Sequence, residues 1–177
     1  FAKGTKIKLT QPTVKYLFVV GATYSSPNTT VTVTGGVDYT LANAAITDTY
    51  YSNQLVVPGF ALNGTFDWSG ASGLNIQGFS GTPTQSASFS MLGGLVVLYM
   101  NITGTSNADS MTGTLPMTPT VSGRYPVRSR NNTTDYDWGE VSITASSATV
   151  TFYKNAAEAA WATSNTKAIQ NATIIYR

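Results

Sequence analysis

The side chains that could do chemistry gather around position 135. Three carboxylates and two aromatic rings lie within six residues: Asp135, Tyr136, Asp137, Trp138 and Glu140. A glycosidase needs two carboxyl groups that face each other across a sugar at roughly 5–10 Å, which one short loop does not supply. The same oxygens suit calcium, but their spacing matches no known calcium-binding loop. Two interpretations remain: a solvated, turn-forming acidic loop, and a loop that contacts a sugar through its aromatic rings.

Three arginines precede this acidic segment. Arg124, Arg128 and Arg130 share one face if the chain is extended here, because side chains alternate along a strand. We expect ion pairs with the acidic loop or with a neighbouring subunit; the alternative is contact with an anionic sugar. The candidate contacts with a receptor or glycan are therefore six residues: Arg128, Arg130, Asp135, Tyr136, Asp137 and Trp138.

The composition excludes catalysis that depends on histidine or cysteine. The 177 residues include no histidine and no cysteine, which rules out Ser-His-Asp and Cys-His catalysis, disulfides and Cys-ligated zinc. We therefore expect neither an enzyme nor a bound cofactor or metal. Charged residues make up 10% of the chain and the net charge is +2, too little for binding nucleic acid through many phosphates. The longest apolar run, residues 95–100, is far shorter than the roughly 20 residues of a membrane span, so we expect no membrane insertion.

The elements that must position these side chains are β-strands. In GEVSITASSATVTFY, residues 139–153, apolar and polar residues alternate on both sides of a short Ala-Ser-Ser-Ala link. That pattern predicts a hairpin of two half-buried strands. Similar short strands, separated by turns rich in Gly, Pro and Asn, recur along the chain and predict an all-β fold. Only residues 42–46 and 155–161 have a helical pattern, and both stretches are short.

The chain divides where the alternation fails. Residues 49–60, which contain a Pro-Gly pair, predict a linker. Residues 61–177 predict a jelly-roll-like antiparallel β-sandwich. The first part, residues 1–48, predicts a small β-barrel or meander with four strands, at residues 6–10, 14–21, 29–34 and 38–41.

Lysines give the N-terminal part a basic edge. Lys6 and Lys8 alternate with apolar residues in the first predicted strand, and two further lysines lie nearby. Lysines of this kind are typical of an edge strand that is protected against aggregation. The alternative, contact with nucleic acid, is disfavoured by the low total charge.

Two passages resemble surface proteins of tailed-bacteriophage particles. Residues 4–46 (GTKIKLTQPTVKYLFVVGATYSSPNTTVTVTGGVDYTLANAAI), followed closely by YYS, are similar to a small β-module of such virions. The second passage is similar to the C-terminal head domain of phage tail fibres. It combines TGTLPMTPT, YPVRSRNN, WGEVSITASSATVTFYKN and AWATSNTKAIQNATIIY, all between residues 112 and 176.

The resemblance implies a non-enzymatic virion protein that is assembled in the host cytoplasm. Members of this group are typically homotrimers that present a β-sandwich knob, which implies a homotrimer here. The N-terminal segment would contact other virion proteins. The knob would attach to a glycan or protein of the host surface through its loops, with residues 131–138 as the candidate loop. The alternative is a capsid decoration or head-fibre protein that stabilises the particle.

Overall fold

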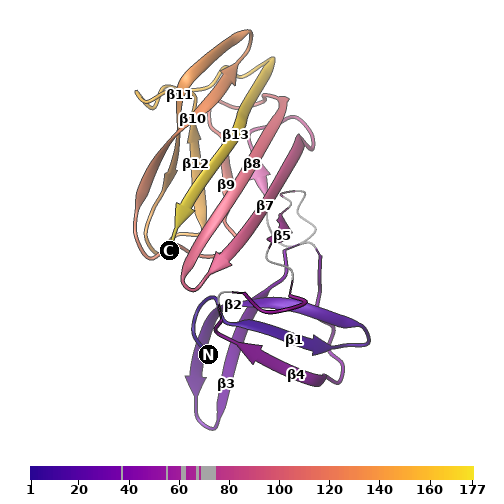
Figure 1. Ribbon diagram of the computed structural model, residues 1–177. Coiled ribbons are helices and arrows are strands. Elements are labelled where there is room, and N and C mark those ends of the chain that lie inside the picture. Colours follow the sequence, from indigo (N-terminus) through magenta and orange to yellow (C-terminus); the bar gives the residue numbers. More distant parts are fainter. Residues whose placement is uncertain (37, 55, 61–62, 67, 69–74) are drawn as a thin grey trace.

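The fold consists of two antiparallel sheets (Figure 1). A computed structural model describes residues 1–36, 38–54, 56–60, 63–66, 68 and 75–177, except for the side chains of residues 63–66 and 137. The described residues form thirteen strands and no helix, which confirms the prediction of an all-β chain with a β-sandwich. No helix in this part of the chain is therefore long and apolar enough to cross a membrane.

The first sheet contains four strands in the order β3-β2-β1-β4. The strands are β1 (Lys6–Thr10), β2 (Val14–Ser25), β3 (Asn28–Thr34) and β4 (Thr47–Ser52). The first three form the predicted meander. The prediction of a fourth strand at residues 38–41 is wrong, because β4 begins six residues later and pairs with β1. The sheet therefore extends to residue 52, past the predicted boundary at residue 48. Among the described residues, neither β3 nor β4 pairs with a further strand.

The prediction that the lysine-bearing strand lies at a sheet edge is also wrong. Strand β1 lies between β2 and β4. Lys6 is buried, and its Nζ donates a hydrogen bond to the backbone oxygen of Gln54 at 2.8 Å. Burial lowers the pKa of the Lys6 amine. Lys6 therefore ties the start of the linker to the sheet, whereas Lys8 stays exposed.

The side chain of Gln11 holds the segment between β3 and β4 in place. Its Nε2 donates to the backbone oxygens of Ala42 and Ala44 at 2.9 and 2.8 Å, and its Oε1 accepts from the Ala42 amide at 2.9 Å. These bonds replace the backbone bonds that a helical turn would need. The predicted helical turn at residues 42–46 is absent for this reason.

We expect Gln11→Ala to lower the free energy of unfolding of the first sheet by about 2 kcal/mol, since three hydrogen bonds to the backbone of residues 42–44 are lost. Urea unfolding gives the size of the effect, and amide hydrogen exchange at residues 42–46 gives its place. Gln54→Ala is the matched control, because the side chain of Gln54 is exposed and the backbone oxygen that Lys6 uses remains. A loss in Gln11→Ala no larger than that of the control would contradict the prediction.

The second sheet contains nine strands in the order β5-β7-β8-β13-β10-β11-β12-β9-β6. Figure 1 shows the sheet folded over, with β7, β8 and β13 in one layer and β9 and β12 in the layer behind. The strands are β5 (Asn63–Phe66), β6 (Ile76–Gln77), β7 (Thr84–Leu92), β8 (Leu95–Thr105), β9 (Thr112–Thr114), β10 (Gly123–Asn131), β11 (Thr134–Ile143), β12 (Thr149–Tyr153) and β13 (Thr166–Tyr176).

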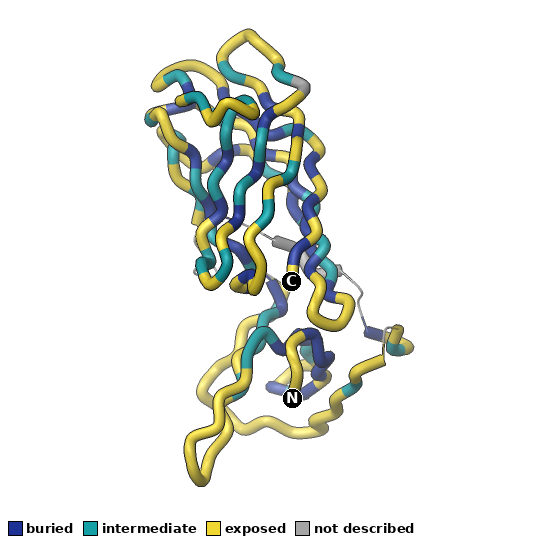
Figure 2. The backbone as a smooth tube through the Cα atoms, turned by 90° about the vertical axis from the view of Figure 1, so that its left-hand side faces the viewer, coloured by how far each residue is buried: buried dark blue, intermediate teal, exposed yellow. Residues whose placement is uncertain are grey.

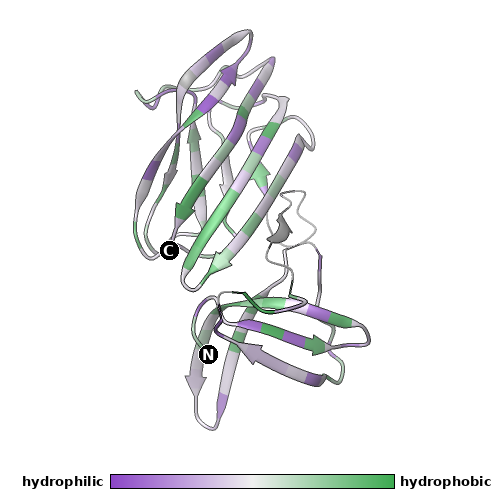
Figure 3. Ribbon diagram, viewed as in Figure 1, coloured by the Kyte–Doolittle hydropathy of each residue, from purple (hydrophilic) through white to green (hydrophobic). Residues whose placement is uncertain are grey.

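The core of the sandwich follows from the alternation along its strands. The predicted hairpin is β11–β12, where Val141 pairs with Phe152 and Ile143 with Val150. All four side chains are buried. Burial also alternates along β8 and along the second half of β13, and Figure 3 shows the half of β8 nearer the first sheet as hydrophobic. The inward-facing side chains of both layers meet in one hydrophobic cluster, as expected for a β-sandwich.

Residues 155–161 form turns and a loop, so the prediction of a helix there is wrong. Asn155 accepts a hydrogen bond from the Ala159 amide through its side-chain oxygen, and Glu158 has a positive φ of 56°. The segment ends by burying Trp161, whose Nε1 donates to the Phe152 oxygen at 2.8 Å. Anchoring of one aromatic side chain thus outweighs the weak helical preference of the alanines.

The two sheets share part of one hydrophobic cluster. Phe18 of β2 packs edge-to-face on Phe60 of the linker, with ring centres 5.2 Å apart, and on Phe89 of β7 at 5.9 Å. Close to this cluster, Gly4 lies against the β7–β8 turn, so tightly that a Cβ there would lie 1.6 Å from the Gly93 oxygen. The first sheet is therefore packed against one end of the sandwich.

Candidate functional site

The candidate residues lie in the β10–β11 hairpin. Residues 131–138 were expected to form a loop, but only Asn132 and Thr133 form the turn, and β11 already begins at Thr134. Asn132 has a positive φ of 62°, a conformation that Asn adopts readily and that a tight hairpin turn needs. The threonine and the aromatic residues that follow favour a strand. The acidic segment is therefore a strand with one side facing solvent.

A β-bulge shapes this strand beside Arg128. Val127 pairs with Gly139 and Ser129 pairs with Tyr136, so β11 has one more residue than β10 in this interval. Residues 137 and 138 both lie opposite Arg128. Trp138 is 68% exposed, an unusual amount for so large an apolar side chain. Bulges of this kind re-aim side chains and are common beside functional sites.

Tyr136 does not join the exposed group. Directly paired residues project to the same face of a sheet, and Tyr136 pairs with Ser129, which is fully buried. Tyr136 is half-buried and therefore lies on the opposite face from Trp138. The side chain of Asp137 lies outside the described residues. Of the six predicted site residues, four share the outer face: Arg128, Arg130, Asp135 and Trp138.

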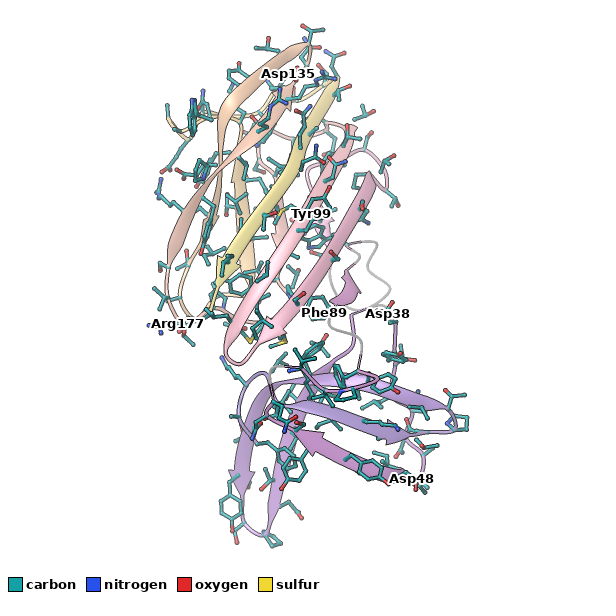
Figure 4. All side chains as sticks on the ribbon, viewed as in Figure 1. Asp38, Asp48, Phe89, Tyr99, Asp135 and Arg177 are labelled. Atoms are coloured by element: carbon teal, nitrogen blue, oxygen red, sulfur yellow. The ribbon has the colours of Figure 1, made fainter. Side chains whose placement is uncertain are left out.

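Arg130 and Asp135 form an ion pair across the hairpin. Arg130 Nε lies 2.6 Å from Asp135 Oδ1, and Nη2 lies 3.0 Å from Oδ2, a bidentate arrangement. The hydrogen bond from Arg130 lowers the pKa of the Asp135 carboxyl, with a smaller contribution from the charge of Arg128. This pair joins two paired positions of β10 and β11, so the predicted ion-pair interpretation holds for Arg130. Figure 4 shows Asp135 near the end of the sandwich farthest from the first sheet.

Arg124 pairs at the other end of the hairpin. Its Nη1 lies 2.9 Å from Glu140 Oε1, and it also contacts the carboxylate of Glu158. These three charges join β10, β11 and the loop before Trp161. They hold structural elements together. Arg128, in contrast, lies next to the exposed Trp138.

A second bulge lies in the same row on the other side of Arg128. On β13, Ile169 pairs with Ile102 and Ala172 pairs with Met100, so residues 170 and 171 both lie opposite Asn101 of β8. Gln170 also pairs with Arg128, and Asn171 has a positive φ of 49°. The two bulges therefore flank Arg128 on both neighbouring strands. The bulge in β11 turns Trp138 outward, and the bulge in β13 adds Gln170 and Asn171 to the row.

These residues form one row across five strands, which we call the outer strip. Adjacent strands lie about 4.8 Å apart, so the row spans about 19 Å. Tyr99 lies beside it, and its hydroxyl donates to Asn171 Oδ1 at 3.0 Å; Figure 4 shows Tyr99 midway along the sandwich. In the order of the strands, the outer strip consists of Trp138, Arg128, Gln170, Asn171, Asn101 and Ser86.

The chemistry of the outer strip is that of recognition. It offers one indole ring, a guanidinium, amides and a hydroxyl, all at least partly exposed. It contains no nucleophile with an adjacent base. Among the described residues, no three Asp, Glu, His or Cys side chains are placed to hold a metal ion. A shallow row of amides, an arginine and an aromatic ring is suited to a ligand rich in hydroxyl groups.

Sequence reasoning missed four of the six residues of this strip. Gln170, Asn171, Asn101 and Ser86 were not predicted as site residues, because they lie about 30 to 50 residues from the acidic segment and carry no charge. One signal was present: the pattern AIQNATIIY breaks its alternation at Gln-Asn, as a bulge requires. The pairing that brings β13 next to β10 has no such local signal.

No protein-family model, curated protein or solved structure matches the chain. The case for a function therefore rests on the residues of this chain and their geometry. The outer strip is the strongest feature among the described residues, because it combines a highly exposed tryptophan with two bulges in one row.

Proposed function

We propose that the chain is a non-enzymatic attachment protein on the surface of a tailed-phage particle, and that its outer strip binds a host surface glycan. The observation that carries the proposal is the exposed Trp138 beside Arg128, at a bulge that turns it outward. Aromatic rings pack against the apolar faces of sugar rings, and arginine and amide side chains donate to hydroxyl and carboxylate groups.

Several weak sites together give firm attachment. A single shallow strip of this size offers few contacts and pays the full entropy of binding, so we expect weak affinity for one site. Copies on one particle raise the local concentration of sites and convert weak contacts into avid ones. The proposal therefore needs several copies of the chain on each particle, and the homotrimer implied by the resemblance is one way to provide them.

The first sheet offers a surface for another virion protein. Phe1, Tyr50 and Tyr51 are all more than 60% exposed, and Phe1 packs edge-to-face on Tyr51 with ring centres 5.6 Å apart. Lys8 Nζ lies 5.8 Å from the centre of the Tyr50 ring. Exposed aromatic rings are typical of protein interfaces. This surface also favours the second candidate function, capsid decoration. If the protein decorates the capsid, we expect phage particles that lack it to lose thermal stability.

Trp138→Ala tests the glycan proposal. We expect roughly a tenfold or greater loss of affinity for host surface polysaccharide, the equivalent of about 1.4 kcal/mol, because the stacking surface is removed. The measurement is binding of the purified protein to immobilised host polysaccharide, with thermal unfolding as a check of the fold. Tyr50→Ala is the matched control, since Tyr50 is similarly exposed but belongs to the first sheet. Equal binding by wild type and Trp138→Ala would overturn the site assignment.

A further inference from the structure

The hairpin of β2 and β3 projects from the first sheet as a two-stranded arm. Strand β1 pairs only with the first part of β2, from Val14 to Phe18, whereas β3 pairs with the part from Phe18 to Ser25. Residues 22–30 are all exposed. Figure 2 shows this hairpin as an exposed projection at the far end of the molecule from the sandwich. We call residues 21–32 the arm.

The arm has one apolar face and one polar face. Ala22 pairs with Val31, and Tyr24 pairs with Thr29, which places these side chains on one face. The residues between them, on the other face, are mainly threonines. Tyr24 is 70% exposed. Val31 is half-buried and packs against the core of the first sheet, whereas Ala22 and Tyr24 are exposed. The exposed apolar surface at Ala22 and Tyr24 favours contact with a second surface.

The arm has no charged residue to protect its outer edge, although β2 has a bulge at the base of the arm, between Val19 and Gly21. No Lys, Arg, Asp or Glu occurs between residues 16 and 37. Strand β3 is an edge strand with seven residues, NTTVTVT, and contains no proline. Soluble proteins normally protect such an edge with charges, proline or bulges. A hairpin of two strands is also barely stable on its own, and a third strand stabilises it.

We propose that β3 pairs with β3 of a second copy of this chain, antiparallel and centred on Thr30. A two-fold axis normal to the sheet then places Thr30 opposite Thr30, and Thr29 opposite Val31, of the two copies. The result is a four-stranded sheet, β2-β3-β3-β2, with a continuous apolar face. The sequence is complementary to itself in this register because no charge meets a like charge, and paired threonines are favourable. This pairing does not depend on glycan binding.

The absence of cysteine makes a direct test simple. Residues paired across antiparallel strands have Cα atoms about 4.5–5.5 Å apart, which is within the range of about 4.4–6.8 Å for a disulfide. We expect Thr30→Cys to form a covalent dimer under mild oxidation. Thr103→Cys, an exposed position on β8, is the control and is expected to stay uncrosslinked. The Thr30→Cys chain is also mixed with a Thr49→Cys chain. If Thr30→Cys cross-links only to Thr49→Cys and not to itself, β3 pairs with β4 of the second copy and the proposal is overturned.

The mass in solution gives the second readout. We expect the wild type to form a dimer or a larger even-numbered assembly, and Thr30→Lys to halve its mass, because two lysines then face each other across the contact. Thr103→Lys is expected to keep the wild-type mass, and fluorescence of the buried Trp161 reports that each variant is folded. A monomeric wild type would overturn the proposal, as would a trimer whose mass Thr30→Lys leaves unchanged.

Discussion

Phe89→Ala is expected to lower the free energy of unfolding by about 4 kcal/mol, the usual effect of removing a buried phenylalanine. Phe89 lies on the inner face of β7 and is 1% exposed. Its ring packs on that of Phe18, and Phe18 packs on Phe60. The cavity left by the substitution therefore opens where the sandwich, the linker and the first sheet meet. Guanidinium unfolding measures the loss, and Ile175→Ala, at an exposed position of β13, is the control with a small expected effect.

A double-mutant cycle then tests the contact between the two sheets. Phe18→Ala and Phe89→Ala are combined in one chain, and the stability of the double variant is compared with the sum of the single losses. Edge-to-face rings in contact give a coupling of about 1 kcal/mol beyond additivity. Additive losses would show that the first sheet is not packed on the sandwich in solution.

The strands could be predicted because their burial follows the alternation of side chains. Val141, Ile143, Val150 and Phe152 alternate with polar residues in the sequence, and all four are buried in β11–β12. A period of two carries this information without any knowledge of the partner strand. The outer-face arginines were predicted by the same rule, since Arg124, Arg128 and Arg130 do alternate with inward residues of β10.

The bulge in β11 could not be predicted from alternation, because it changes which face the following residues occupy. The extra residue in β11 places Trp138 on the outer face, whereas uninterrupted alternation from Tyr136 would have placed it inside with that residue. The face on which a side chain lies is set by the hydrogen-bond register with the neighbouring strand. The same limit applies to the outer strip, whose residues come together only through pairing of β10 with β13 and of β13 with β8.

Tertiary contacts overrode two short local patterns. The alanines of residues 42–46 and 155–161 favour a helix, but such short helices are unstable alone. Gln11 holds the first segment through three hydrogen bonds, and burial of Trp161 fixes the second. Gln11 lies 31 and 33 residues from Ala42 and Ala44, so no local pattern shows their contact. Trp161 ends the second segment itself, but it is fixed by a hydrogen bond to Phe152 outside that segment. Strand β4 was not predicted for a similar reason, since it pairs with β1, which lies about 40 residues earlier in the sequence.

Lys167 is a second buried cation, and its position in the core would not be expected from its charge. Its side chain is fully buried, and its Nζ donates to the backbone oxygens of Ala108 and Ser110 at 3.1 and 2.8 Å. The ring centres of Phe79 and Trp161 lie 5.2 and 5.8 Å away. Loss of hydration outweighs these contacts and lowers the pKa of the amine to about 8, although the nearby Asp109 opposes the shift.

The low pKa makes the stability depend on pH in a defined direction. The unfolded chain binds the Lys167 proton up to about pH 10.5, whereas the folded chain releases it near pH 8. Between these values the unfolded state holds more protons, so the free energy of unfolding rises with pH. Below pH 8 the cost of burying the charged amine is present in full. We expect a gain of about 2 kcal/mol between about pH 7.5 and 10.

Lys167→Met should remove this gain, because methionine fills a similar volume and binds no proton. The measurement is the difference in unfolding free energy between wild type and variant at each pH, which cancels the titration of other groups. This matters because burial raises the pKa of Tyr125 and Tyr176, and these phenols reduce stability above about pH 10. Lys3→Met, at an exposed position, should keep the wild-type rise. A rise of equal size in Lys167→Met would mean that another group is responsible and that Lys167 titrates normally, with its amine reached by water.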